Sequence, residues 1–390
     1  MYFRILFIIL LTSSAVASSH AATEGDRRAI NDAYMQYQAF MAKGASARAD
    51  AIEPAGRAYR LALEVYGRAH RNTAALAINY GNVLPDRVQA AQVLHEGLAM
   101  SELVYGNDAI ELIDPLIAMG DVTTDLRDLT AARAHYSRAL EIIQKRSHKD
   151  SFLEGFLLLS LGVTNYIDNK RLDAIKQFRT AREILAKHDT PIAILRRATA
   201  ELWIGTYLVA TNRYQEALEP LLASLAVFSA FPETHFTMLT TYKLLVETYE
   251  ALEMRDAATN YVLAIGAITK TEPVLLYQVR PKRPTSFEET VHLLVIDEIT
   301  TTAPVSLYEV KPSTMLRRES VVVNFTVDEQ GYPRDASVVS SDNIGLNSTS
   351  LESILKMRYA PRFESGKAVE TLDESHTFNF EPMCPIGVSC

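Results

Sequence analysis

The sequence contains few of the residues from which catalytic and metal sites are built. Its 390 residues include only two cysteines and one tryptophan, and the nine histidines are scattered without metal-ligand spacing. No H-E-x-x-H, G-x-S-x-G or P-loop pattern is present, so the usual signatures of zinc peptidases, serine hydrolases and nucleotide-binding enzymes are missing. We therefore expect a protein without enzymatic activity, cofactor or metal ion.

The sequence also lacks an excess of positive charge. Lys and Arg number 39 against 47 Asp and Glu, which gives a formal net charge of −8. Proteins that bind nucleic acid need a basic surface, so we expect no nucleic-acid partner. The hydrophobic share of 48% and the charged share of 22% are typical of a folded soluble protein, and the length allows two or three domains.

Hydrophobic runs of membrane-spanning length are missing as well. The apolar run at the start, Ile5–Ala17, follows Arg4 and would reach only about 20 Å as a helix, against about 30 Å of hydrocarbon. Ala15–Ala17 and Ser19–Ala21 both fit the small-x-small pattern of signal cleavage. We predict that residues 1–21 are a cleaved signal peptide; retention as a membrane anchor is the alternative.

Both cysteines, Cys384 and Cys390, lie in the tail 383–390. An exported protein meets an oxidising compartment, which favours a disulfide between the two. A redox or metal pair is the alternative, but it would need closer spacing or further ligands.

The middle of the chain repeats a spacing of small residues. Two small residues stand seven apart with a large residue four after the first, as in Ala132, Tyr136 and Ala139. Small residues on both sides of a bulky one suit a helix that packs closely on its neighbour. Successive repeats are 35, 42, 42, 43 and 40 residues apart. The six pairs of small residues are Ala55–Ala62, Ala90–Gly97, Ala132–Ala139, Ala174–Ala181, Ala217–Ser224 and Ala257–Ala264.

This pattern resembles that of tetratricopeptide repeats in a longer form of about 40 residues. The resemblance covers residues 53–271 and implies helical hairpins that stack into a right-handed superhelix, with 24–52 as an N-terminal helix or cap. Hairpins are expected, for example, at Phe152–Asn169 with Leu172–His188. A generic antiparallel helical solenoid is the alternative, and either architecture is a binding scaffold.

The tetratricopeptide resemblance also implies a partner-binding groove on the concave face. The family's groove positions fall on Phe156, Leu159 and Tyr166 in the fourth unit and on Tyr242 and Tyr249 near the end of the array. Such a groove would be apolar and aromatic, which favours an extended or helical segment over a charged tail. The alternative is that some of these residues are core between helices.

The segment 272–312 interrupts the helical periodicity with Pro273, Pro281 and Pro284, and we predict a linker there. Within it, Val291–Ile299 alternates weakly and could add a strand to the sheet that follows.

The last part of the chain alternates in the manner of strands. Apolar side chains alternate along Val321–Val327, Asp328–Gly331 is a polar turn, and Ala336–Ser341 reads as the return strand. Leu346–Met357 places apolar residues at helical spacing, and Thr377–Phe380 gives a last short strand. The predicted order is strand, strand, helix, strand.

This order resembles the C-terminal domain of TonB-type energy transducers, periplasmic modules that grip outer-membrane transporters. Asp342 departs from the family pattern, where a Gly closes the turn, and Asn347 stands where Asp is common. An unrelated small α+β module is the alternative. The matching residues are Phe325, Val327, Asp328, Gly331, Val338, Ser340, Ser341, Leu346, Leu351, Pro361 and Gly366.

The TonB resemblance implies a domain over 313–382 whose last strand can accept a peptide as an added strand. The partner-binding edge would then consist of His376, Thr377, Phe378, Asn379 and Phe380. The alternative is that the tail 383–390 covers this edge. The long Pro-rich spacer of TonB itself is missing, so the resemblance is taken to imply the fold and peptide binding but not energy transduction.

Together these patterns predict a mainly α protein, a tetratricopeptide-like α-solenoid followed by a small α+β domain with the order β-β-α-β. We expect an exported periplasmic scaffold or adaptor of a Gram-negative bacterium, without a stable membrane anchor. Its partners would be proteins or peptides of the cell envelope, with an outer-membrane receptor as one candidate. The alternative function is a membrane-anchored TonB-type energy transducer for outer-membrane receptors.

Overall fold

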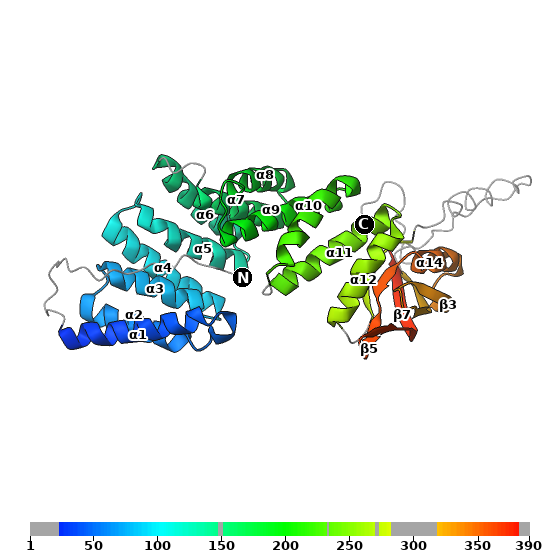
Figure 1. The fold of residues 1–390 in the computed structure, drawn as a ribbon, viewed down its shortest axis with the longest axis horizontal. Helices are drawn as coiled ribbons and strands as arrows, with labels where there is room; N and C mark the ends of the chain where they lie inside the picture. The colour runs from blue at the N-terminus through cyan, green and yellow to red at the C-terminus, as the bar shows by residue number, and fades with distance from the viewer. Residues whose placement is uncertain (1–22, 147–150, 232–233, 270–272, 282–317, 382–390) are drawn as a thin grey trace, which may run out of the picture. The chain divides into compact units, whose positions relative to one another are not determined.

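A computed structural model of the chain describes residues 23–146, 151–231, 234–269, 273–281 and 318–381 (Figure 1). The predicted signal peptide, the segment Val291–Ile299 and the two cysteines lie outside the described residues. The chain divides into two compact units, and the division passes through two helices of the array. The first unit comprises residues 1–207 with 222–234, and the second comprises 208–221 with 235–390.

The first unit is built from antiparallel helical hairpins, each of which contacts the next (Figure 1). Its helices are α1 (Glu24–Ala42), α2 (Ile52–Tyr66), α3 (Arg71–Val83), α4 (Arg87–Tyr105), α5 (Ile113–Asp125), α6 (Leu129–Lys145), α7 (Phe152–Ile167), α8 (Arg171–Leu185), most of α9 (Pro191–Ala210) and the second half of α10 (Tyr214–Phe228). Each predicted repeat therefore corresponds to a hairpin, and the mainly helical fold class is confirmed.

In three of the repeats the bulky residue packs against a glycine of the preceding helix. Phe178 of α8 is fully buried, and a Cβ added to Gly162 of α7 would lie 2.5 Å from its ring. Gly81 of α3 stands in the same relation to Leu94 of α4, at 2.6 Å. Contacts this short leave no room for a side chain, so the glycines set how closely the two helices of a hairpin approach.

Four of the hairpins share the same turn between their two helices. Arg127, Asn169, Asn212 and Glu253 each have a positive φ between 57° and 64° and end the first helix of a hairpin. The next residue then donates its N–H to a carbonyl five residues back, as Lys170 N does to Asn165 O at 2.8 Å. This left-handed turn satisfies carbonyl groups that the helix end leaves open.

The sixth repeat begins one residue later than its sequence suggested. Ala258 is fully buried while Ala257 is half-buried, and Ala258 donates its N–H to Met254 O, the residue before α12 (Arg255–Thr269). Ala217 makes the same bond to Arg213 O before α10. Two adjacent alanines made the spacing ambiguous, and the start of the helix decides which of them is buried.

Helix α1 covers the start of the array. Ile30, Ala33 and Tyr37 are its buried face, and its other positions are mostly polar and exposed. A capping box at Thr23 and Asp26 begins the helix. A helix that is apolar on one face only is suited to end a stack of repeats.

The second unit joins a last helical hairpin to a small sheet domain. α11 (His235–Ala251) packs on α12, and β1 (Val274–Tyr277) contacts α11. The domain continues with β2 (Glu319–Val327), β3 (Pro333–Ser341), α14 (Asn347–Ile354), β4 (Arg358–Ala360), β5 (Arg362–Glu364), β6 (Lys367–Val369) and β7 (Thr371–Phe380). The expected strand–strand–helix–strand order is present, with three additional short strands before β7.

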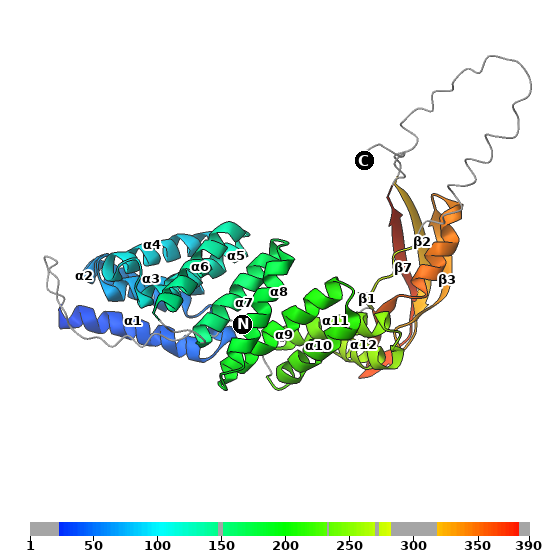
Figure 2. The same cartoon turned by 90° about the horizontal axis from the view of Figure 1, so that it is seen from above.

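One three-stranded antiparallel sheet holds the core of this domain. The strand order is β3-β2-β7, and α14 runs beside the sheet (Figure 2). Val321, Val323, Phe325 and Val327 of β2 are buried with Phe378 of β7. These are the alternating positions that the sequence marked as one buried face.

The turn between β2 and β3 requires its glycine. Gly331 has a φ of 88°, and any side chain there would collide with the carbonyl oxygen of Tyr359. Asp328 Oδ1 accepts the N–H groups of Gln330 and Tyr332 at 2.9 and 2.8 Å. The predicted polar turn is thereby confirmed, and its close approach ties the turn to β4.

Part of the segment predicted as a linker is a strand instead. β1 pairs antiparallel with β4, with Val274 opposite Ala360. The four residues of β1, Val274–Tyr277, are all apolar or aromatic and show no alternation that would mark a strand in the sequence. The pairing makes β1 part of the sheet domain.

Candidate partner-binding surfaces

β7 forms one edge of the three-stranded sheet. Among the described residues its only strand partner is β2, so its other side pairs with no strand there. An unpaired strand edge presents N–H and C=O groups to which a further strand can add. The residues expected to bind a partner, 376–380, lie at the end of this edge.

The β7 edge is regular over the stretch that contains these residues. Seven consecutive pairs, from Glu319 with Phe380 to Phe325 with Glu374, show no shift in register. The opposite edge, β3, shifts register twice along its pairing with β2. The single shift in the β2–β7 pairing, near Asp373 with its φ of 58°, lies before the seven regular pairs. Irregular strands are poor templates for a further strand, so β7 is the edge suited to strand addition.

The side chains of this segment alternate between core and solvent. Phe378 and Phe380 are buried, whereas Thr377 and Asn379 are exposed. His376 is half-buried, and its Nε2 has no hydrogen-bond partner in the described part of the chain. Burial lowers the pKa of the His376 imidazole below its usual value.

Asp342 shows why this domain can dispense with a glycine after the second strand. Its carboxylate accepts hydrogen bonds from Ser320 N at 2.9 Å and from Ser320 Oγ at 2.8 Å. Its own N–H is donated to Ser320 O at 2.9 Å. These bonds hold the end of β3 against the start of β2, where the sheet leads into α14.

Three of the expected groove residues lie on α7 and face its neighbours. Leu159 is 3% exposed, so it packs in the core. Phe156 is half-buried and lies under the guanidinium of Arg196, 4.8 Å from the ring centre. Tyr166 is half-buried and contacts Trp203 of α9, with ring centres 5.1 Å apart. Part of this helix face is thus used in packing against α9.

The other two expected groove residues lie on α11. Tyr249 is 8% exposed and stacks on Tyr261 of α12, with ring centres 5.9 Å apart. Tyr242 also contacts Tyr261, at 5.6 Å, and packs on the cluster that contains Ala360 of β4. The sheet domain therefore covers the part of the last hairpin from which Tyr242 projects.

The contact between the last hairpin and the sheet domain contains a buried ion pair that sequence reasoning missed. Arg358 of β4 is fully buried; its Nη1 lies 2.7 Å from Glu250 Oε1, and its Nη2 donates to Thr259 Oγ1 at 2.7 Å. Its guanidinium also stacks on Tyr332 at 3.5 Å. Burial raises the pKa of the Glu250 carboxyl, and Arg358 opposes that shift. A charged residue between apolar Met357 and Tyr359 was the only signal in the sequence.

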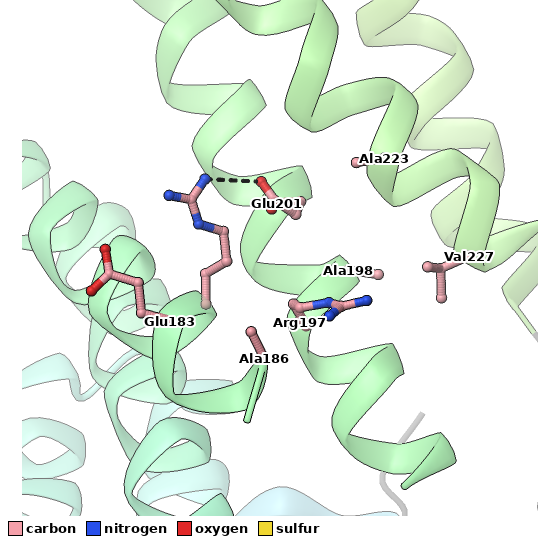
Figure 3. A pocket seen from close by; sticks show the side chains of 8 residues that line it. Glu183, Ala186, Arg197, Ala198, Glu201, Ala223 and Val227 are labelled. Atoms are coloured by element: carbon pink, nitrogen blue, oxygen red, sulfur yellow. Dashed lines mark ion pairs between the residues drawn. The ribbon is translucent and has the colours of Figure 1, made fainter. Parts of the chain in front are cut away.

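A partly open cavity of about 340 Å³ lies between α8, α9 and α10 in the first unit (Figure 3). Arg182 lies at the cavity and forms an ion pair with Glu201 of α9, at 3.5 Å. None of the expected groove residues lines it. Its lining residues are Arg182, Glu183, Ala186, Arg197, Ala198, Glu201, Ala223 and Val227.

No helix in the described part of the chain combines the length and the apolar character needed to cross a membrane. No group of three or more His, Cys, Asp or Glu side chains is placed there to hold a metal ion.

Comparison with known proteins identifies the C-terminal domain. Residues 317–382 match the family model of the Gram-negative bacterial TonB protein C-terminal. No curated protein matches the chain. The domain match covers the sheet from β2 to β7, but it leaves out β1, which the preceding segment supplies.

Solved structures resemble the chain loosely. Aspartyl phosphate phosphatase F from Bacillus subtilis is similar at 17% identity and a TM-score of 0.45, over 66% of this chain and 76% of that one. The structure of pilF from Pseudomonas aeruginosa is similar at 14% identity and a TM-score of 0.41, over 62% of this chain and 94% of that one. The chain thus carries a tetratricopeptide-like helical array, as its own helices and turns show, followed by a TonB C-terminal domain.

Proposed function

We propose that this chain is an exported periplasmic scaffold that holds partner proteins of the cell envelope. Two features support the proposal: a helical repeat array, an architecture suited to binding proteins, and a C-terminal domain of a Gram-negative envelope family. The observation that carries it is the regular register of β7 over residues 375–379, at the edge of the sheet. Partners add to this edge as a further strand, with an outer-membrane receptor as one candidate.

Proline substitution tests the β7 edge, because adjacent residues of a strand direct their N–H groups to opposite sides. One of the two variants His376→Pro and Thr377→Pro loses a backbone hydrogen bond to β2. The other loses only an N–H group that points away from the sheet. The variant that keeps the melting temperature is then tested for co-purification of envelope proteins with the tagged full chain. We expect it to lose these proteins, whereas Val339→Pro on β3 keeps them. If the β7 variant with the unchanged melting temperature still co-purifies the same proteins, the proposal is contradicted.

Export is tested by fractionating cells that express the native chain and measuring the intact mass of the product. A periplasmic species that begins near Ser18 or Ala22 supports the scaffold, since such a species has no membrane anchor. The same mass shows whether Cys384 and Cys390 have lost two hydrogens on forming a disulfide. A full-length species in the inner membrane would favour the alternative, an anchored energy transducer.

A further inference from the structure

The cavity between α8, α9 and α10 is open because small residues line it. Ala186 at the C-terminal cap of α8, Ala198 of α9 and Ala223 of α10 face the same space, and Ala198 is 2% exposed. Three methyl groups at a crossing of three helices leave unfilled volume that larger side chains would occupy. The volume of about 340 Å³ falls within the range of about 300–1,000 Å³ seen for ligand pockets. It can hold one or two side chains of a bound peptide.

The charged side chains around this cavity differ in whether they have a partner of opposite charge. Arg182 and Glu201 form an ion pair with each other, and their side chains are 37% and 17% exposed. Figure 3 shows the Glu183 carboxylate directed away from the cavity. Arg197 projects from α9 toward the side of Val227, and no described residue forms an ion pair or hydrogen bond with it.

A half-buried arginine beside apolar walls matches one kind of ligand group. The guanidinium is planar and offers parallel N–H donors that fit the two oxygens of a carboxylate. Ala198, Ala223 and Val227 provide apolar surface for the methylene groups that precede such a carboxylate. A neutral or basic side chain would leave the charge of Arg197 unmatched.

We propose that this cavity binds a polypeptide segment of a partner through an Asp or Glu side chain, whose carboxylate pairs with Arg197. The site lies on α8, α9 and α10 and shares no residue with the expected groove on α7 or with the β7 edge. The inference rests on the proposed scaffold function, but it is independent of strand addition at β7.

The test uses a phage-displayed library of random 12-residue peptides, selected on the full chain. We expect the enriched peptides to share an acidic residue next to apolar ones. The binding of a selected peptide should fall by about tenfold or more in Arg197→Gln, and equally when its acidic residue is replaced by Gln or Asn. Arg179→Gln, an exposed arginine of α8 outside the cavity, is the matched control and should change nothing.

A second variant fills the cavity without removing charge. Ala223 is exposed, so Ala223→Phe should leave the melting temperature unchanged while it blocks the peptide. Enrichment of peptides without acidic residues, no enrichment, or binding that survives both Arg197→Gln and Ala223→Phe would overturn the inference. Peptides that depend on the β7 edge but not on Arg197 would also overturn it, and they would leave the scaffold function standing.

Discussion

Arg358 and Glu250 lie 108 residues apart in the sequence, yet their side chains meet at 2.7 Å in a buried ion pair. Glu250 belongs to the last helical hairpin and Arg358 to the sheet domain. Together with the pairing of β1 and β4, this contact makes the hairpin and the domain parts of one structure.

Removal of Arg358 should destabilise the second unit strongly. Arg358→Ala leaves Glu250 buried without its partner, and loss of one member of a buried pair costs about 3–5 kcal/mol. Urea unfolding of the full chain measures the loss. Replacing both residues, as in Arg358→Met with Glu250→Leu, should recover most of it. Arg334→Ala, which breaks the exposed pair with Glu370, should have no measurable effect. Equal effects of Arg358→Ala and Arg334→Ala would contradict this account.

The sheet domain should need the last hairpin in order to fold stably. A fragment from residue 313 lacks β1 and exposes Arg358 and Ala360, which are fully buried in the chain. A fragment from residue 235 keeps α11, α12 and β1. We expect cooperative unfolding of the longer fragment and a lower urea midpoint, or no transition, for the shorter one. Equal midpoints would show that the hairpin contributes nothing to the stability of the domain.

The glycines that face a bulky residue within a hairpin, Gly81, Gly120 and Gly162, should not tolerate a methyl group. A Cβ at Gly162 would lie 2.5 Å from the buried ring of Phe178, and overpacking of this kind costs about 1–3 kcal/mol. Thermal unfolding of Gly162→Ala should therefore show a lower melting temperature. Gly25→Ala is the matched control, because Gly25 lies on the exposed side of α1, where alanine favours the helix by up to about 1 kcal/mol. An unchanged melting temperature in Gly162→Ala would be inconsistent with the tight packing.

The sheet domain should lose stability in mild acid through His376. Burial lowers the pKa of His376 from its usual 6.5, so the unfolded chain binds a proton more readily than the folded one. The contribution of neutral His376 to the free energy of unfolding is fully present above about pH 6.5. It is lost as the pH falls from 6.5 through the lowered pKa of the folded chain.

This pH effect is measured as the difference between the native chain and His376→Gln in urea unfolding at pH 7.5 and 5.5. The native chain should lose more stability between the two than the variant does. His70 and His135, whose pKa values burial also lowers, remain in both proteins, so the comparison isolates His376. Parallel losses in the two proteins would rule out a role for His376.

Local patterns were sufficient to predict the elements but not their long-range contacts. The spacing of Ala132, Tyr136 and Ala139 predicted the hairpins, because close helix packing requires small residues at fixed intervals. Alternation along Val321–Val327 predicted β2 and its buried face for the same kind of local reason. The pairing of Arg358 with Glu250 depends on contacts between distant segments, to which no local pattern corresponds.

The candidate sites were predictable to a smaller extent. Helical periodicity marks Leu159 and Tyr249 as members of an apolar face, but it does not say whether another helix covers that face. The cavity at Arg197 arises where three helices meet, so its alanines are far apart in the sequence. The β7 edge was predictable because the family pattern places the last strand, whereas its regular register is visible only in the structure.

The most direct test of strand addition places a photo-crosslinking amino acid at single positions of the full chain in cells. Ser375, Thr377 and Asn379 are exposed positions along the regular edge of β7, and Ser337 and Val339 are exposed positions on the irregular β3. We predict adducts with the same envelope protein at the three β7 positions and none at the two β3 positions. Adducts at β3 alone, or no adduct at any β7 position, would contradict the claim that β7 binds the partner.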